Sequence, residues 1–349
     1  MKEINFVCRW SFPKESSWSG THLNILNSLK KIYSVTEINL KNYKIISLLK
    51  KLKFIRLAYF LQNMIDKNKI KKQAKGNILF MFDAIYVGKR YKHYIYIDLS
   101  YSLLLYLNEN ENEKYKNSSF NYTRSQLLFF SKKQNRYFEK CDCIFSMSNY
   151  LNKFLYESNK NYRIKTVYAG VNVFPSKIEK KAQGRKLLFV GKDYIRKSGD
   201  VVYNTFLKLK KEYSDIELYF AGPKINPFDN VEGYHFLGEL SPNKLKNYFE
   251  LCDIYCMPSK FEAFGIVFCE ALLHGMPIIA YNDYEMRNII SDKYGVCINE
   301  ISESEIIKSV IYLFDNKEIG QNIKDDFNLL SSTYSWDTVA EKIKVELNR

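Results

Sequence analysis

The chain has 349 residues, of which 46% are hydrophobic and 26% charged, and its formal net charge at pH 7 is +15. This length predicts two domains, and the ordinary composition excludes a fibrous or disordered protein. No apolar run approaches the ~20 residues of a membrane span, and residues 1–10 lack the apolar core of a signal peptide. We therefore expect a cytoplasmic protein, either soluble or peripheral on the inner face of the membrane.

The excess of positive charge has three open interpretations. It can serve binding to nucleic acid, binding to an anionic membrane surface, or neither, because Lys, Asn and Ile are abundant throughout the chain. A nucleic-acid-binding protein is disfavoured, because no recognition motif of that class occurs among the basic residues. We expect no nucleic-acid partner.

The seven cysteines are expected to be free thiols, since their number is odd and no export signal precedes them. Cys141 and Cys143, like Cys252 and Cys256, have spacings that metal sites also use. No set of histidines completes such a site, so we interpret these cysteines as small buried apolar residues and expect no metal.

The first half of the chain alternates predicted strands and helices. Strands are predicted at residues 4–8, 77–83, 94–98 and 143–148, and helices at 21–31, 124–140 and 150–156. A polar loop is expected at 108–119. Asp98 ends the third of these strands, where open α/β sheets bind ligands, although an Asp there can also cap the following helix.

The turn after the first strand reads Trp18-Ser19-Gly20-Thr21. It is not the Gly-x-Gly-x-x-Gly of dinucleotide-binding enzymes, which disfavours a dehydrogenase. It resembles the Trp-Ser-Gly-Thr loop of one branch of the group 1 glycosyltransferases, and the resemblance implies that Gly20 lets a ligand approach the backbone at the first strand-to-helix turn. The alternative is an ordinary helix cap formed by Ser19 or Thr21.

Residues 41–75 are rich in Lys and Arg, hold the single acid Asp66, and intersperse aliphatic and aromatic side chains. This pattern fits an interfacial helix on an acidic lipid surface. It equally fits a helix that packs on the first sheet and exposes a basic face to solvent.

The second half repeats the α/β pattern after a polar, lysine-rich linker at 174–186. Strands are predicted at 186–191, 216–222, 234–237, 253–257 and 278–280, with a helix at 200–213 and a short apolar helix that begins at Phe264-Gly265. Gly275 and Pro277 end that short helix.

The start of the short helix suits a phosphate. The N–H groups of Gly265, Ile266 and Val267 have no partner within the helix and lie at the positive end of its dipole. The side chain of Glu270 leans back toward this end and can accept hydrogen bonds from the two hydroxyls of a ribose. Glu262, in the preceding loop, can face the other side of a diphosphate.

The stretch Pro258 to Pro277 reads Pro-Ser-x-x-Glu-x-Phe-Gly-x-x-x-x-Glu-Ala-x-x-x-Gly-x-Pro. It resembles the signature of the family 4 (group 1) glycosyltransferases, in which two glutamates are eight positions apart. The resemblance implies the GT-B fold, an α/β architecture of two Rossmann-like domains that face a central cleft, with a C-terminal helix that crosses back to the first domain. The implied parts are residues 1–172, 173–333 and 334–349.

The resemblance also implies roles for individual residues. Lys192 and Lys197 would grip the diphosphate, Glu262 would hold the transferred sugar, and Asp98 would face the cleft. The implied donor-binding residues are Gly20, Arg196, Phe264, Gly265, Ile266, Val267 and Glu270. Lys192 stands where the family has Arg and lacks the two-pronged guanidinium, and Arg196 can compensate.

The implied reaction is transfer of a sugar from a UDP- or GDP-sugar to a saccharide or lipid-linked acceptor on the first domain. It would retain the anomeric configuration and need neither a metal nor a cofactor, with the nucleotide sugar as co-substrate. The pathway would be synthesis of cell-envelope polysaccharide or glycolipid. A nucleotide-sugar epimerase of the same fold is the alternative enzyme, and the N-terminal loop and the basic segment favour a bulky acceptor over it.

Overall fold

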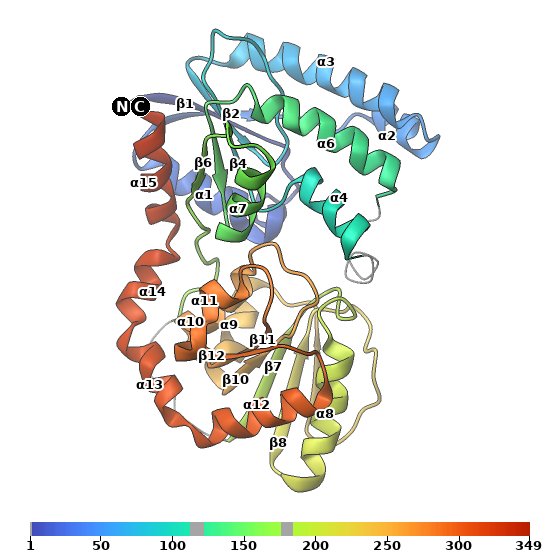
Figure 1. The fold of residues 1–349 in the computed structure, drawn as a ribbon, viewed down its shortest axis with the longest axis vertical. Helices are drawn as coiled ribbons and strands as arrows, with labels where there is room; N and C mark the ends of the chain where they lie inside the picture. Colours follow the sequence, from blue (N-terminus) through green and yellow to red (C-terminus); the bar gives the residue numbers. More distant parts are fainter. Residues whose placement is uncertain (1, 112–121, 176–183) are drawn as a thin grey trace. The chain divides into compact units, whose positions relative to one another are not determined.

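The computed structural model describes residues 2–111, 122–175 and 184–349, which divide into two compact units (Figure 1). The first unit holds the described residues up to 105, from 123 to 170, and from 336 to 349. The second holds those from 106 to 122 and from 171 to 335. The chain therefore leaves the first unit after Gly170 and returns to it at Trp336, near the boundaries expected at 172 and 333.

The first unit is built on a parallel sheet with strand order β2-β1-β3-β4-β5-β6. Its strands are β1 (Glu3–Cys8), β2 (Ser34–Asn39), β3 (Asn77–Met81), β4 (His93–Ile97), β5 (Cys143–Ser146) and β6 (Ile164–Thr166). All residues of β4 and β5 are buried, as expected for strands covered on both faces. In this order β1 lies beside β3. Strand β2 lies on the outer side of β1, and β4, β5 and β6 follow in turn on the outer side of β3.

Helices follow the strands of the first sheet in the order expected for an α/β fold. They are η1 (Lys14–Gly20, a 3-10 helix), α1 (Thr21–Lys30), α2 (Lys44–Lys51), α3 (Ile55–Gln73), α4 (Tyr101–Asn110, which enters the second unit at residue 106), α6 (Arg124–Phe138) and α7 (Asn149–Ser158). One more helix of this unit, α15 (Trp336–Leu347), comes after the second unit in the chain. The last helix packs against α1, with Val339, Ala340 and Ile343 buried. Thr123 and Gln126 form a capping box at the start of α6.

The second unit is built on another parallel sheet, with strand order β12-β11-β10-β7-β8-β9. Its strands are β7 (Arg185–Val190), β8 (Ile216–Ala221), β9 (Tyr234–Gly238), β10 (Ile254–Cys256), β11 (Ile278–Tyr281) and β12 (Gly295–Ile298). The helices are α8 (Gly199–Glu212), α9 (Pro242–Leu251), α10 (Ile266–Leu273), α11 (Met286–Tyr294), α12 (Glu303–Asp315), α13 (Lys317–Asp325) and α14 (Phe327–Thr333). The predicted α/β class, with two Rossmann-like sheets, is confirmed.

The basic segment 41–75 forms two helices, and the expectation of one interfacial helix is wrong in this respect. Helix α2 ends where Lys53 adopts a left-handed backbone with φ 63°. The N–H of Phe54 donates to the carbonyl of Leu49 at 2.9 Å, a bond of the kind that closes a Schellman turn. Helix α3 then begins at Ile55.

Two other expected features have a different outcome. The polar loop predicted at 108–119 is helical at its start, because α4 continues to Asn110, and residues 112–121 lie outside the described residues. Of the expected linker, residues 176–183 also lie outside them. No helix in the described part of the chain combines the length and apolar character needed to cross a membrane.

Candidate functional site

Two loops of the second unit leave neighbouring strands at the same edge of the sheet. One follows β7 and runs from Gly191 to Ser198, and the other follows β10 and runs from Met257 to Gly265. Strand order reverses between β7 and β10, and open α/β sheets bind ligands at such a point. The N–H of Lys260 donates to the carbonyl of Arg196 at 2.9 Å, so the backbones of the two loops are joined.

Glu262, Lys197 and Arg196 form an ion cluster between these loops. Glu262 Oε1 lies 3.1 Å from Lys197 Nζ and 3.3 Å from Arg196 Nη1, and all three side chains are at most 13% exposed. Burial alone would raise the pKa of Glu262, but the two cations, Lys197 first, hold it below its usual value. The carboxylate therefore stays charged in a site that is largely closed to water.

Neighbouring groups fix the positions of these cations. The Arg196 guanidinium also binds Asp193 Oδ2, at 3.2 Å from Nε, and the carbonyl of Phe261. Lys197 Nζ donates to Met257 Sδ at 3.4 Å. A Cβ on Gly191 would lie 2.4 Å from Lys197 Cδ, so glycine leaves the space that the lysine stem occupies.

Helix α10 starts directly after this cluster. Gly265 precedes it with φ 83°, a left-handed conformation that favours glycine. Within the described residues, the N–H groups of Ile266 and Val267 donate no hydrogen bond, and that of Phe268 donates to the Gly265 carbonyl. The helix thus offers free amides and the positive end of its dipole beside Lys197 and Arg196, an arrangement that suits an anion.

Glu270 is 4% exposed and faces the segment that follows Gly170. Its Oε1 accepts a hydrogen bond from the N–H of Asn172 at 3.0 Å, and the N–H of Val173 is a second donor. Burial nevertheless raises the pKa of Glu270 to about 7, against the effect of these two donors. The buried acid therefore has a local structural partner that the sequence did not indicate.

The remaining predicted residues lie further from this cluster or in the first unit. Lys192 is 77% exposed and pairs with Glu239 at 3.4 Å, so it carries a surface charge outside the buried cluster. The Phe264 ring is buried against Tyr334, which leaves only its backbone for a ligand. Gly20 precedes α1 with φ 96°, and Asp98 follows β4, both in the first unit.

Sequence reasoning missed several residues that shape the site. Ser259 Oγ donates to Glu262 Oε1 at 3.2 Å, and Asp193 holds Arg196. Ser198 adopts φ 57°, and its buried Oγ has no hydrogen-bond partner in the described chain. Of these, Ser259 stands within the motif itself, whereas the orientation of Asp193 depends on a turn whose geometry the sequence does not indicate.

Comparison with known proteins identifies the second unit. Residues 172–327 match the family described as glycosyl transferases group 1, and this match contains Glu262, Glu270 and both loops. The match covers a little under half of the chain, and over these residues the chain is similar to the group 1 glycosyltransferases. The residues brought together at the switch point of the sheet are thus those of a glycosyltransferase domain.

Two relatives show how far the similarity extends. A segment of 243 residues is 24% identical to an uncharacterized glycosyltransferase of Haemophilus influenzae and covers 66% of this chain and 67% of that protein. A segment of 176 residues is 24% identical to the phosphatidyl-myo-inositol mannosyltransferase of Mycobacterium tuberculosis. It covers 46% of each chain, so the match spans less than half the length of that mannosyltransferase.

Two solved structures resemble the whole chain. Sucrose-phosphate synthase from Thermosynechococcus elongatus has a TM-score of 0.68 at 14% identity, with 99% of this chain and 98% of that chain covered. WaaG, a glycosyltransferase involved in lipopolysaccharide biosynthesis, has a TM-score of 0.67 at 15% identity, with 97% and 98% covered. The glycosyltransferase domain and the first unit together have the GT-B fold of these enzymes.

Proposed function

We propose that the protein transfers a sugar from a UDP- or GDP-sugar to a saccharide or a lipid-linked acceptor. The observation that carries this proposal is the cluster of Lys197, Arg196 and Glu262 beside the free amides of α10. Cations and oriented amides in a site closed to water stabilise the charge that develops on a leaving diphosphate. The match of residues 172–327 to the group 1 glycosyltransferases supports this assignment.

In the proposed donor complex, the diphosphate lies at the N-terminus of α10 and contacts Lys197 and Arg196. Lys192 reaches it from the surface. A carboxylate has about four acceptor positions, so Glu270 can bind ribose hydroxyls in addition to the N–H groups of Asn172 and Val173. Glu262 accepts hydrogen bonds from the transferred sugar while its two cations remain in place.

The finer chemistry of the proposal follows the family resemblance. The reaction retains the anomeric configuration, the leaving phosphate helps to deprotonate the acceptor, and the cations and amides take the place of a metal. Asp98 and Gly20 contribute from the first unit, which receives the acceptor.

The acceptor is proposed to be part of a cell-envelope glycolipid or polysaccharide. One relative acts as a phosphatidyl-myo-inositol mannosyltransferase, and WaaG is involved in lipopolysaccharide biosynthesis. A lipid-linked acceptor requires the enzyme to work at a membrane surface, and the first unit has a surface suited to this.

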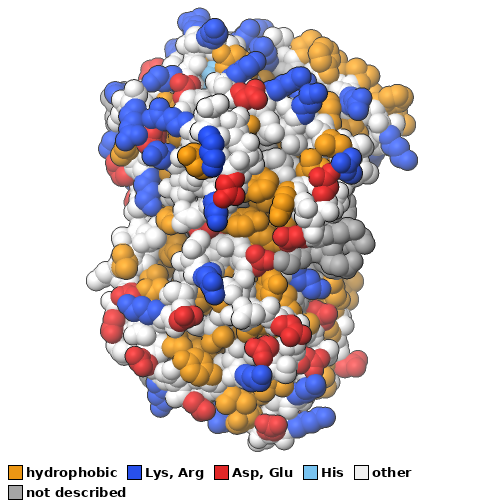
Figure 2. Space-filling view, in the orientation of Figure 1, with side chains coloured by type: hydrophobic (Ala, Val, Ile, Leu, Met, Phe, Trp, Pro, Cys, Tyr) orange, Lys and Arg blue, Asp and Glu red, His pale blue; other side chains and the backbone are white. Residues whose placement is uncertain are grey.

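The proposed membrane surface consists of the exposed faces of α2 and α3. Exposed apolar side chains there are Ile45, Leu48, Leu52, Phe54, Leu57, Phe60 and Met64, with exposed fractions from 47 to 64%. Lys44, Lys51, Lys53 and Arg56 are exposed among them. Figure 2 shows this mixture of hydrophobic and basic side chains in the region where α2 and the start of α3 lie. Such a surface inserts apolar groups and attracts anionic lipid headgroups.

The test is nucleotide release from a panel of UDP- and GDP-sugars, with and without membrane extracts as the acceptor source. Release of nucleotide that depends on the extract is expected for one donor. Glu262→Gln should abolish it, and Glu270→Ala should weaken donor binding. Formation of an epimerised nucleotide sugar without nucleotide release would instead identify an epimerase and contradict the proposal.

A further inference from the structure

Asp193, in the loop that follows β7, engages Arg196 with both oxygens of its carboxylate. Its Oδ2 lies 3.2 Å from Arg196 Nε, and its Oδ1 accepts the backbone N–H of Arg196 at 3.4 Å. The carbonyl of Asp193 also accepts the N–H of Lys197 at 3.1 Å, which closes residues 193–197 into a single turn. Asp193 therefore fixes both the backbone and the side chain of Arg196.

The second loop holds the other end of the same guanidinium. Arg196 Nη1 lies 3.3 Å from Glu262 Oε1 and also donates to the carbonyl of Phe261. A guanidinium is a rigid plane, so partners at Nε and at Nη1 together determine where Nη2 lies. The orientation of Arg196 thus depends on Asp193 on one side and on Glu262 on the other.

Arg196 and Glu262 each keep one polar atom that the protein does not use. In the described part of the chain, Arg196 Nη2 donates no hydrogen bond. All hydrogen bonds and ion pairs of the Glu262 side chain there fall on Oε1, which leaves Oε2 without a partner. Neither Nη2 nor Oε2 is buried. The pair therefore presents an N–H donor and a carboxylate acceptor to a ligand.

The two lysines of the same loop do not depend on Asp193. Lys197 Nζ donates to Met257 Sδ at 3.4 Å, and Lys192 lies at the surface. Neither ammonium group contacts Asp193 within the described residues. An effect of Asp193 on a bound anion would therefore pass through Arg196.

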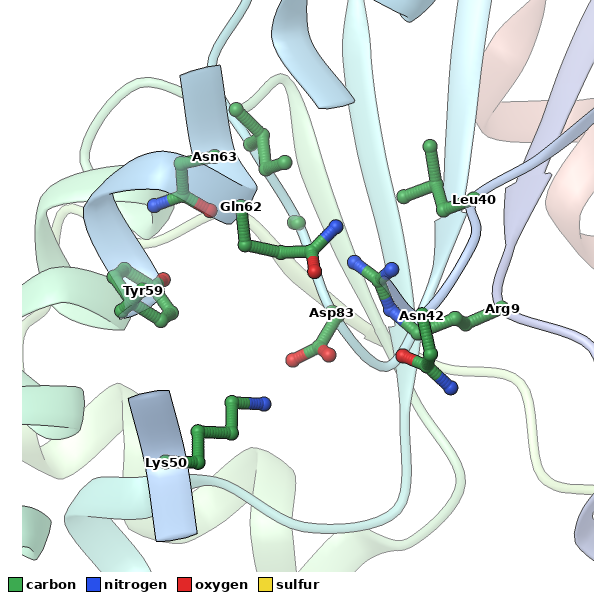
Figure 3. A pocket seen from close by; sticks show the side chains of 10 residues that line it. Arg9, Leu40, Asn42, Lys50, Tyr59, Gln62, Asn63 and Asp83 are labelled. Carbon is green, nitrogen blue, oxygen red and sulfur yellow. The ribbon is translucent and has the colours of Figure 1, made fainter. Parts of the chain in front are cut away.

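A buried aspartate–arginine pair in the first unit offers a contrast. Arg9 lines a cavity of about 140 Å³, and Figure 3 shows its guanidinium facing Gln62. Asp66 Oδ2 accepts from both, at 2.6 and 2.9 Å, and the Asp66 side chain is fully buried, so its loss would leave a buried network without its acceptor. Asp193 is 32% exposed, and its partner Arg196 keeps a second carboxylate, so loss of Asp193 should affect orientation more than folding.

We propose that Asp193 is a positioning residue of the donor site. By holding Nε, it keeps Arg196 oriented so that Nη2 meets an oxygen of the donor's diphosphate while Nη1 keeps Glu262 in place. Without Asp193, the long side chain of Arg196 would become ordered only when the ligand binds, and this ordering would reduce the affinity. The nature of the ligand follows from the proposed function, on which this inference rests.

The test measures the binding of UDP and GDP to the full chain by calorimetry, so it needs neither transfer nor an acceptor. We expect the wild type to bind at least one of the two nucleotides. Asp193→Ala should weaken that binding by about tenfold, since a hydrogen bond to a charged group contributes about this much. Asp193→Asn keeps the shape and one acceptor oxygen, and should weaken the binding by about threefold.

A double-mutant cycle separates the orientation of Arg196 from a general effect on the loop. In an Arg196→Met background, Asp193→Ala should change nucleotide binding by less than about twofold, because the group that Asp193 orients is absent. A residue that only shaped the loop would have the same effect in both backgrounds. Asp193→Ala should lower the melting temperature by less than about 4 °C, and the cycle is repeated with Asp193→Asn, which keeps the shape of the side chain.

The matched control is Asp215→Ala. Asp215 lies 2.8 Å from Nη1 of Arg185, the first residue of β7, and its side chain is 58% exposed. This pair lies at the opposite end of β7 from the two loops. The variant removes a carboxylate from another arginine of the second unit, and it should leave nucleotide binding unchanged.

Three results would overturn the inference. These are binding by Asp193→Ala as tight as that of the wild type, an equal loss in the Arg196→Met background, or a loss with Asp215→Ala as large as with Asp193→Ala. A wild type that binds neither UDP nor GDP would refute the proposed donor site together with this inference. If nucleotide binds through Asp193 and Arg196 but no sugar is transferred from any donor, the proposed function fails and the positioning role stands.

Discussion

The carboxylate of Glu270 accepts a hydrogen bond from the backbone N–H of Asn172 at 3.0 Å, although 98 positions separate the two residues. The contact ties helix α10 to the segment that enters the second unit. It also shows how a buried acid remains tolerable on an apolar helix, because backbone donors replace part of its lost hydration. The two donors replace only part of the hydration that the carboxylate loses, so the pKa of Glu270 remains raised.

The first prediction concerns the pH dependence of stability. The pKa of Glu270 rises on folding from an ordinary 4.5 to about 7. Between these values the folded protein holds a proton that the unfolded chain releases, so this contribution to stability is full below pH 4.5 and is lost as pH rises through about 7. The loss is on the order of 3 kcal/mol. The free energies of unfolding of the wild type and of Glu270→Gln are measured in urea at several pH values. From about pH 5 to about pH 8, the wild type should lose stability relative to the variant.

The control for this prediction is Glu262→Gln. The pKa of Glu262 lies below its usual value because of Lys197 and Arg196, so its contribution is lost only as pH falls through that lower value. The difference in free energy of unfolding between Glu262→Gln and the wild type should therefore stay constant from about pH 5 to about pH 8. If this difference changes with pH as much for Glu262→Gln as for Glu270→Gln, Glu270 is not the group responsible for the loss of stability.

The second prediction separates the two lysines that were both expected to grip the diphosphate. Lys197→Met leaves the buried Glu262 with Arg196 as its remaining cation, and should cost about 2–3 kcal/mol of unfolding free energy. Lys192→Met removes an ammonium that is 77% exposed and should change stability by less than about 0.5 kcal/mol. Both variants should bind the donor more weakly in calorimetry. If Lys192→Met proves as destabilising as Lys197→Met, the burial of the lysine does not determine how much its loss destabilises the protein.

The third prediction concerns the turn before α10. Gly265 has φ 83°, and a Cβ there would lie 2.6 Å from the Phe268 ring. Gly265→Ala should therefore destabilise the protein by about 1–3 kcal/mol and weaken donor binding, because the first amides of the helix must move. Gly320→Ala is the matched control: it lies in α13, and a Cβ there has no neighbour within 4 Å. It should be neutral or stabilising by up to about 1 kcal/mol in thermal unfolding.

The fourth prediction concerns the membrane surface. Replacing Lys44, Lys51 and Lys53 together by Glu should abolish sedimentation with phosphatidylglycerol vesicles, because each lysine near such a surface contributes about 1 kcal/mol. The matched control replaces the exposed Lys211, Lys244 and Lys324 of the second unit by Glu, with the same change of net charge. Equal loss of binding in both triple variants would mean that overall charge, and not this surface, attracts the lipid.

The α/β class could be predicted from the sequence because strands such as β4 and β10 are continuous apolar runs that a parallel sheet buries on both faces. Helix α10 was also predictable, since Gly265 precedes it and Gly275 follows it. Strand β2 was missed, because it lies at the edge of its sheet and its sequence Ser-Val-Thr-Glu-Ile-Asn shows no continuous apolar run.

Other parts of the molecule had no local signal. The break between α2 and α3 depends on Lys53 in a left-handed conformation. Glycine is the usual residue at such a position, so a lysine there does not predict the end of a helix. The contact of Glu270 with Asn172 joins residues far apart in the chain. The resemblance named Lys197, Arg196 and Glu262 in separate ligand-binding roles and did not predict that they pair with one another. Their ion cluster, and the burial that makes Lys197 differ from Lys192, follow from the packing of two loops.

Helix α15 belongs to the first unit but is translated after the whole of the second. Its Trp336 lies so close to Gly170 that a Cβ there would collide with it, and Val339 and Ile343 are fully buried. A ribosome that has completed residues 1–170 has therefore not yet produced a finished first unit. The nascent chain must keep the surface of α1 uncovered until residues 336–347 emerge, so premature termination anywhere in the second unit would damage both halves of the protein.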